Sequence, residues 1–447
     1  MNKYISIIVS SLIIISCSSD NPKELSEEPN ISAENIYDEE NRWIYSQMNR
    51  NYLWRTNLPD SLDCNYSNDP VTFFESLLSD KDRFSYCLRN SSYNIKSDQY
   101  NWGFSYQEYS TPDNDVYMQV LYVSSEDLKQ QGLRRGDWLK EHSTNTSNTK
   151  QFKKYILSNN KFIETTSLII STRDIYNSNS TVLLDSVYHI QNKRIGYMCY
   201  LEFNTQQELA PALNKFKEAH IEEMILDLRY NPGGYVSTCK YLCNCIVNEE
   251  AYNNIFQIHS YNDILTEELY KDTGDSLNIE YYSHPKNTET SLTAGIIPLK
   301  LKRIYILTSH NTASASEATI ICLRPYMEVI VIGEDTYGKG VGSSTLYDSR
   351  YKYALQPIIF QYYNADMETV PGSGIKTDYY ISDGYETPKR EIGDIDEPLL
   401  STAINIITGN NTPIKNINHR EDNIMLTPVG EPSFVKEHYL KMKKYEH

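Results

Sequence analysis

The sequence predicts an α/β core, built from a mixed sheet with flanking helices, joined to a β-rich domain and a small N-terminal helical region. Three observations support this fold class. Apolar strands alternate with amphipathic helices in the second half of the chain, strand-like runs precede them, and helical spacing dominates near the start. We expect the helical region at 37–97, the β-rich domain at 98–175 and the α/β core at 176–410.

The α/β core is predicted element by element from its apolar periodicity. Strand patterns lie at 194–201, 224–228, 303–308 and 329–332. Helical patterns lie at 206–220, 236–247 and 314–323. The stretch 248–294 is polar and rich in tyrosine, so we expect a loop or lid there. We expect the tail at 411–447 to be polar and peripheral.

The two upstream regions differ in their spacing. Ile44, Met48 and Tyr52 recur every four residues, which indicates a helix. The runs 116–123 and 167–171 are instead rich in β-branched and aromatic residues, which is typical of strands.

Length and charge limit the functional class. The chain has 447 residues and a formal net charge of −17. Nucleic-acid binding needs clustered Lys and Arg, so this acidic balance argues against a nucleic-acid partner. The 38 tyrosines are spread along the chain and mark no site.

The first residues have the layout of an export signal. Lys3 precedes an apolar run from Ile5 to Ile15, and Ser16 then precedes Cys17. The run is too short to span a bilayer. The Ile-Ile-Ser-Cys sequence resembles a bacterial lipobox, which implies a signal peptide at 1–16, lipidation of Cys17 and a tether at 17–36. The alternatives are a plain signal peptide or a buried strand. We expect a lipid-anchored protein of the Gram-negative envelope, in the outer membrane. Both the periplasmic and the surface face of that membrane are open.

Seven further cysteines follow Cys17, and their odd number and irregular spacing exclude a disulfide framework. Cys239, Cys243 and Cys245 fall on a predicted helix without a completing histidine or second pair. We interpret them as buried thiols and expect neither a metal nor a cofactor.

Ser314 lies between a predicted strand and a predicted helix, in Asn-Thr-Ala-Ser-Ala-Ser-Glu. A serine at a helix N-terminus has free backbone N–H groups beside it, which favour a developing oxyanion. Taken alone, the same position suits an ordinary helix cap.

Lys339 follows the last predicted strand, on the glycine-flanked turn Gly338-Lys339-Gly340. The segment nearly matches a phosphate-binding loop, but Gly340 replaces the metal-binding hydroxyl residue, two acids occupy the cradle and no helix is expected after it. A buried lysine loses proton affinity and can act as a neutral base for a serine. One helix, one strand and a turn separate Lys339 from Ser314, enough to bring them together.

A third segment, Asp-Leu-Arg-Tyr-Asn-Pro-Gly-Gly at 227–234, ends a predicted strand in a turn with exposed N–H groups. Together the three segments resemble the C-terminal processing peptidases, or tail-specific proteases, over roughly 82–403. The resemblance implies that Ser314 is the nucleophile and Lys339 the base. It also implies an oxyanion hole formed by the N–H groups of Ala315 and of Gly233 or Gly234.

One departure lies close to the chemistry. The family often places Gln or Glu four residues after the lysine, whereas this chain has Ser343. Either Ser343 orients Lys339 or another group does. His310 is close to Ser314 in sequence, and we interpret it as a loop histidine.

The β-rich domain is similar to the PDZ module of that family. The similarity lies in the run 131–139, and Trp102, Gly103, Phe104 and Ser105 would form its carboxylate-binding loop. In such a module a peptide adds as a strand. The usual Val-Asn-Gly after Asp137 is missing, and a small sheet domain without a peptide role is the alternative.

The sequence thus predicts a serine endopeptidase that cleaves protein or peptide substrates recognised near their C-termini, through an acyl-enzyme. The alternative is an inactive or weakly active envelope lipoprotein that binds peptides through its PDZ-like module. The oligomeric state is not predicted.

Overall fold

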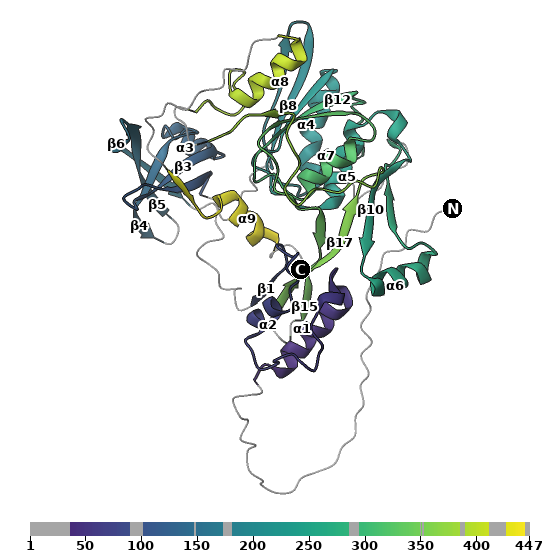
Figure 1. Cartoon of the computed structure of the whole chain (residues 1–447). Helices are drawn as coiled ribbons and strands as arrows, with labels where there is room; N and C mark the ends of the chain where they lie inside the picture. Colours follow the sequence, from purple (N-terminus) through teal and green to yellow (C-terminus); the bar gives the residue numbers. More distant parts are fainter. Residues whose placement is uncertain are drawn as a thin grey trace, which may run out of the picture.

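A computed structural model of the chain describes residues 36–89, 102–146, 149–172, 181–285, 295–348, 350, 353–384, 389–410 and 426–442. The predicted signal peptide, Cys17 and nearly all of the tether lie outside these residues. Figure 1 shows an α/β core with a β-rich domain on one side and a helical region below it.

The core is a six-stranded sheet in the order β18-β13-β12-β9-β8-β7. All neighbouring strands are parallel except β7, which pairs antiparallel with β8. The strands are β7 (Val182–Ile190), β8 (Lys193–Tyr200), β9 (Glu223–Asp227), β12 (Arg303–Thr308), β13 (Glu328–Gly333) and β18 (Tyr379–Tyr380). The predicted mixed sheet is therefore confirmed, with strand boundaries within one residue of those expected for β8, β9, β12 and β13.

Helices cover both faces of this sheet (Figure 1). The helices are α4 (Gln206–Glu218), α5 (Val236–Ile246), α7 (Ala315–Leu323) and α8 (Pro398–Thr408). Successive side chains of a strand point to opposite faces. Leu226 and Ile306 accordingly join the core of α4, α5 and α7, whereas Ile225 and Leu307 pack with α8. Every residue of α7 is buried, which explains its lack of a polar face.

A second sheet extends from the core in the order β11-β10-β17-β14. Its strands are β10 (Ile255–Tyr261), β11 (Asn278–Tyr281), β14 (Val341–Ser343) and β17 (Ile358–Tyr363), and α6 (Asp263–Thr273) follows β10. We call these elements the arm. The expectation of a loop or lid over 248–294 is therefore wrong for β10, α6 and β11. No residue of α6 is fully buried. The helix therefore needs no strong apolar stripe, and its sequence shows none that would have predicted it.

The N-terminal region contains α1 (Asp38–Asn51), the short 3₁₀ turn η2 (Arg55–Asn57) and α2 (Pro70–Ser76). It continues into β1 (Tyr86–Arg89), which pairs with β16 (Tyr353–Gln356), and β16 pairs with β15 (Leu346–Asp348). Ile44 and Met48 pack against Phe74 and, from β16, Leu355. The helical region thus shares one apolar core with strands more than 250 residues away in sequence.

The β-rich domain is a sheet in the order β19-β2-β3-β4-β5-β6. Its elements are β2 (Phe104–Ser110), β3 (Val116–Val123), α3 (Glu126–Gln130), β4 (Trp138–Thr146), β5 (Thr149–Ser158) and β6 (Lys161–Thr172). The sixth strand, β19 (Thr427–Val429), comes from the tail and precedes α9 (Ser433–Met442). Because β19 completes this sheet and Phe434 and Val435 are buried, the expectation of a peripheral tail is wrong for these residues.

None of the helices described here combines the length and the apolar character that a membrane crossing requires.

Candidate active site

The fold brings the three predicted segments to one edge of the core sheet. Strands β9, β12 and β13 are adjacent and parallel, with Leu307 opposite Asp227 and Thr308 opposite Gly333. Each predicted segment begins where one of these strands ends. The carboxyl ends of neighbouring parallel strands are a common location for binding sites, because the loops that follow them converge.

Ser314 is the N-cap residue of α7 and has an unusual backbone conformation. Its φ is +57° and its ψ is −115°, outside the regions that non-glycine residues favour. Such strain persists only where surrounding contacts enforce it, and it is concentrated at functional sites. An ordinary N-cap has β-region backbone angles, so this geometry differs from that of a simple cap.

Ser314 and Lys339 line the same pocket, which has a volume of about 650 Å³. Its other walls come from the glycine turn, α5, the arm and α9, including Gly234, Tyr235, Tyr241, His259, Phe360 and His438. The pocket is large enough for several residues of an extended peptide.

The environment of Lys339 favours a neutral amine. Burial lowers the pKa of Lys339, while the charges of Glu317 and Asp82 oppose that shift. Its Nζ lies 5.6 Å from the centre of the Phe84 ring. Across the described residues, Nζ has no carboxylate within ion-pair distance and no hydrogen bond to Ser314 Oγ. The two residues therefore line one pocket without a direct hydrogen bond between their side chains in this structure.

Glu317 joins the nucleophile segment to the base segment. Its buried carboxylate accepts the N–H of Ser314 at 2.9 Å and the N–H of Lys339 at 2.8 Å. It also accepts the N–H of Gly338 at 2.7 Å and the hydroxyl of Thr336 at 2.5 Å. One side chain thus fixes the backbones of both predicted catalytic residues. Burial raises the pKa of Glu317, against the opposing effect of these four donors.

Tyr362 of β17 provides a second link between the same two backbones. Its hydroxyl oxygen lies 2.8 Å from the carbonyl oxygen of Lys339 and 3.2 Å from that of Ser314. Burial raises the pKa of Tyr362 well above its ordinary value, so the hydroxyl remains a donor. The arm therefore contacts the backbones of both residues through Tyr362.

The glycine turn lies directly against Ser314. A Cβ at Gly233 would be 2.8 Å from Ser314 Cβ, so only glycine fits there. The side chain of Asn231 accepts the N–H of Gly233 at 2.9 Å and donates to Tyr200 O at 3.0 Å, which fixes the turn. Of the three predicted oxyanion residues, Gly233 thus has an occupied N–H. In the part of the chain that the structure describes, the N–H groups of Gly234 and Ala315 have no protein acceptor.

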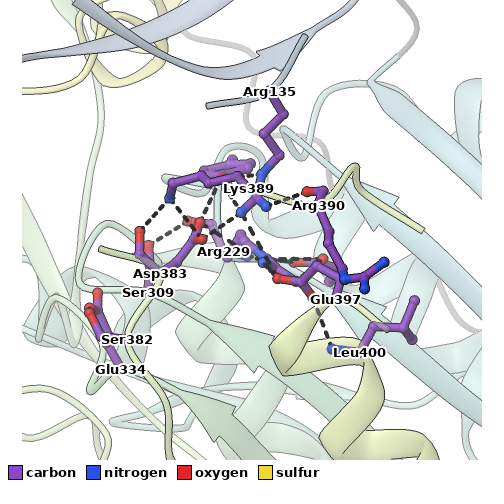
Figure 2. Close-up of polar contacts among 12 residues, drawn as sticks. Arg135, Arg229, Ser309, Glu334, Ser382, Asp383, Lys389, Arg390, Glu397 and Leu400 are labelled. Carbon is purple, nitrogen blue, oxygen red and sulfur yellow. Dashed lines mark hydrogen bonds and ion pairs between the residues drawn. The ribbon is translucent and has the colours of Figure 1, made fainter. Parts of the chain in front are cut away.

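A buried charged network surrounds Arg229, which precedes the glycine turn in the chain (Figure 2). Arg229 lies between Asp227, at 2.9 Å, and Glu397, at 2.6 Å. The arginine charge lowers the pKa of Glu397 although burial opposes ionisation. Ser309, after β12, donates its hydroxyl to the carbonyl of Arg229, which joins the turn to the nucleophile strand.

The same network reaches the β-rich domain through Arg135 (Figure 2). Arg135 donates to Asp383 at 2.5 Å and to the hydroxyl of Tyr230 at 3.1 Å, and Lys389 approaches Asp383 to 3.0 Å. Although burial opposes it, the cationic neighbours hold the pKa of Asp383 well below its usual range. The network therefore fixes the β-rich domain to the core next to the site.

The other predicted residues lie apart from the Ser314–Lys339 pair. Ser343 lines the pocket, where its hydroxyl accepts Gln356 Nε2 at 3.0 Å, and it has no hydrogen bond to Lys339 within the described ranges. His310 is exposed, with its ring 6.0 Å from that of Tyr337, and is absent from the pocket lining.

The predicted peptide-binding loop packs inside the β-rich domain. Gly103 O accepts the N–H groups of Ser124 and Ser125, and Phe104 is buried against the Phe152 ring at 5.3 Å. Ser105 is buried as well. The loop thus begins β2 and does not line the pocket of Ser314.

The cysteines of α5 are free and buried, as predicted. A survey of the described residues finds no group of acids, histidines and cysteines arranged to hold a metal ion.

Sequence reasoning missed Glu317, Tyr362 and Asn231 as functional positions. Glu317 stands three residues after Ser314, the spacing of a capping box, and that signal could have identified its bond to Ser314 N. Nothing in the sequence indicates that Tyr362 approaches the site.

Comparisons with known proteins agree with this arrangement. The family model "Peptidase family S41" matches residues 194–381, and "Peptidase S41 N-terminal domain" matches residues 39–86. A "Probable CtpA-like serine protease" of Staphylococcus epidermidis is 26% identical over 245 residues, covering 54% of this chain and 41% of that protein. "Carboxyl-terminal-processing peptidase 1, chloroplastic" of Arabidopsis thaliana is 25% identical over 187 residues, covering 41% of this chain and 33% of that protein.

The matched region therefore spans less than half the length of these curated relatives. A solved S41 protein from Bacteroides fragilis has a TM-score of 0.67 at 23% identity and covers 87% of this chain and 99% of its own. That likeness concerns the fold.

Proposed function

Because the chain belongs to peptidase family S41, with both the peptidase domain and the N-terminal domain of that family, we propose that it is a serine endopeptidase with Ser314 as nucleophile and Lys339 as general base. The observation that carries this proposal is the Glu317 carboxylate, which holds Ser314 N and Lys339 N within 2.9 Å of itself. A pocket shared by a strained serine and a lysine of lowered pKa is suited to nucleophilic catalysis.

In the proposed mechanism, the neutral amine of Lys339 takes the hydroxyl proton of Ser314 as Oγ attacks the scissile carbonyl. The carbonyl oxygen gains negative charge and is stabilised by the N–H groups of Gly234 and Ala315 and by the N-terminus of α7. Lys339 then gives the proton to the leaving amine, which yields an ester on Ser314 and a free amine. Water, deprotonated by the same amine, hydrolyses the ester and restores the serine.

The test is phosphonylation and turnover by matched variants. We expect Ser314 Oγ of the wild type to displace fluoride from a fluorophosphonate, so that the protein gains the mass of the phosphonyl group, and we expect the protein to digest unfolded casein. Ser314→Ala should abolish both, and Lys339→Met should reduce both by at least ~100-fold, since general-base catalysis contributes about that much. His310→Ala, at an exposed neighbouring position, is the control and should remain active. Undiminished casein digestion by Ser314→Ala would refute the assignment.

We further propose that substrates are recognised near their C-termini by the β-rich domain acting as a PDZ-like module. The position of residues 102–105, which lead into and begin β2, supports this proposal, because a ligand strand adding to β2 would begin beside them. Matched peptides with a free or an amidated C-terminus test it. A preference of kcat/KM for the free carboxylate is expected, and equal values would contradict C-terminal recognition.

A second candidate function is peptide binding without turnover. The strand pairing along β2 favours it, since that edge accepts an added strand whether or not Ser314 reacts. Phosphonylation of Ser314 by the fluorophosphonate separates the two functions.

We also propose that the protein is an envelope lipoprotein anchored through Cys17. The support is the lipobox-like sequence alone. Metabolic labelling with a palmitate analogue should mark the wild type and spare Cys17→Ala. Equal labelling of both would refute lipidation at this position.

A further inference from the structure

The tail of the chain occupies an edge of the β-rich domain and a wall of the active-site pocket at the same time. We propose that the edge of β2 is a binding site for an extended polypeptide, and that residues 426–442 occupy it in cis as a competitor of the substrate. The competing ligand is a substrate chain only if the proposed peptidase function holds, but the binding site itself does not depend on catalysis.

The first observation is the pairing of β19 with β2. Thr427, Pro428 and Val429 lie opposite Ser110, Tyr109 and Glu108 in an antiparallel register. The tail therefore runs toward the start of β2 and the loop at 102–105. Without β19, β2 would be an edge strand with unpaired backbone groups. Main-chain pairing depends little on side chains, so the same edge accepts other extended segments.

The second observation is that the tail strand is weakly held. It has only three residues, and all three are exposed. Pro428 lacks an N–H and can donate no bond to the ladder. Gln107 Nε2 lies 3.3 Å from the carbonyl oxygens of Val429 and Gly430. The apolar support lies just outside the strand, where Leu426 is buried with Tyr109 and Trp138. A substrate strand with a longer register and a full set of N–H groups can therefore replace β19.

The anchor of the tail lies further on, at the start of α9. Ser433 Oγ lies 2.8 Å from Ser105 Oγ and accepts the N–H of Tyr106 at 3.0 Å. Phe434 and Val435 are buried against Leu121 and Tyr122 of β3 and against Tyr230 of the core. These contacts hold α9 between the β-rich domain and the core (Figure 1). The anchored tail thus remains close to β2 while its strand is displaced.

The third observation connects this edge to catalysis. His438 of α9 lines the pocket of Ser314 and Lys339, and its Nδ1 lies 2.8 Å from Glu202 Oε1. A shift of α9 would change the pocket wall. The same tail therefore contributes a strand to the β2 edge and a side chain to the wall of the nucleophile's pocket.

Competition in cis follows a simple rule. A tethered segment acts as though present at about millimolar concentration, so a free peptide of equal intrinsic affinity is displaced unless its own concentration is comparable. We therefore expect wild-type protein to bind short peptides poorly and to favour chains with a longer extended segment.

The experiment measures binding in the full chain carrying Ser314→Ala, so that turnover plays no part. The probe is a fluorescein-labelled synthetic peptide with the sequence of residues 426–438, followed by fluorescence anisotropy. Ser110→Cys with Thr427→Cys locks the tail, because directly opposed antiparallel residues have Cα atoms about 4.5–5.5 Å apart, within the range of a disulfide. Phe434→Ala loosens the anchor and favours release.

We expect the disulfide-locked protein to bind the probe at least ~10-fold more weakly than the same protein after reduction. We expect Phe434→Ala to bind the probe at least ~10-fold more tightly than the parent protein does. Thr427→Cys alone, oxidised in the same way, is the matched control and should bind like the parent. Equal probe binding by the locked and reduced forms would overturn the proposal, even if Phe434→Ala failed to fold.

Peptidase activity is measured separately, in chains that keep Ser314. The lock should slow casein digestion reversibly, by roughly the same factor as it weakens binding. Failure of the fluorophosphonate to phosphonylate any form would refute the proposed function, while the anisotropy measurement would still decide the cis competition.

Discussion

Replacement of Glu317 by glutamine tests whether one carboxylate aligns the nucleophile and the base. The four groups around it, at 2.5 to 2.9 Å, are all donors, and only an ionised carboxylate can accept from every one of them. In Glu317→Gln one oxygen becomes an NH₂ group, which must face at least one of these donors. The substitution therefore keeps the side-chain volume and removes only the charge and half of the acceptors.

The expected loss of stability follows from the donors left without a partner. Each buried unpaired N–H costs about 1–3 kcal/mol. With two donors unpaired in Glu317→Gln, the free energy of unfolding should fall by about 2–6 kcal/mol, and Glu317→Ala should cost at least as much. Urea denaturation at neutral pH measures both.

The kinetic expectation has two separable parts. A misplacement of about 1 Å between reacting groups can reduce the rate roughly 100-fold, so the rate at which the fluorophosphonate phosphonylates Ser314 should fall by about that factor. The charge of Glu317 raises the pKa of Lys339, so removing it should move the acid limb of the pH profile of phosphonylation to lower pH. A slower reaction with an unmoved acid limb would refute the electrostatic part of this reasoning.

Glu334→Gln is the matched control for Glu317→Gln. Glu334 follows β13, binds Ser382 at 2.6 Å and is absent from the pocket lining. We expect its substitution to leave the rate and the acid limb unchanged. Wild-type kinetics in Glu317→Gln would contradict the alignment role altogether.

Three further substitutions give independent tests. Phe84→Ala removes apolar cover from Lys339, so the pKa of the lysine should rise and the acid limb of Ser314 phosphonylation should move to higher pH. A shift to lower pH would contradict desolvation as the cause. Gly234→Ala would place a Cβ 2.2 Å from the carbonyl oxygen of Phe203 and should reduce the phosphonylation rate at least ~100-fold. Its control is Gly274→Ala, also at positive φ but in open space, which should retain the rate. Arg135→Met removes one of the cations beside the Asp383 carboxylate. The free energy of unfolding, measured by urea denaturation at pH 7, should fall by about 3–5 kcal/mol. Because the folded pKa of Asp383 lies below the ordinary 3.8, its stabilisation is present above that value and is lost as pH falls, so the penalty should shrink in acid; a penalty independent of pH would count against this pair.

The sequence allowed the core of the fold to be predicted because its signals are local. Strands β8, β9, β12 and β13 are continuous apolar runs, and α4 and α5 have clear helical spacing. The segments around Ser314, Lys339 and the glycine turn were identified by resemblance, which is also a local comparison of short motifs. The structure then places all three at one edge of a sheet.

Other features could not be predicted because they depend on contacts between distant residues. Arg229 meets Glu397 across 168 positions of sequence, and neither residue indicates the other. Tyr362 is one of 38 tyrosines, and only the fold places its hydroxyl between two carbonyl groups of the site. The arm and the tail were missed for the same reason, since α6 lacks a buried face and β19 is three exposed residues paired with a strand more than 300 positions away.

The location of the site at the ends of β9, β12 and β13 makes hydrolytic competence a property of the finished molecule. The hydroxyl and the amine belong to separate strand–loop units, and the carboxylate that aligns them can bridge those units only after β12 and β13 lie side by side. In a copy in which β12 and β13 have not paired, this carboxylate cannot hold the two segments together. If Ser314 and Lys339 act as proposed, such a copy has no assembled catalytic site.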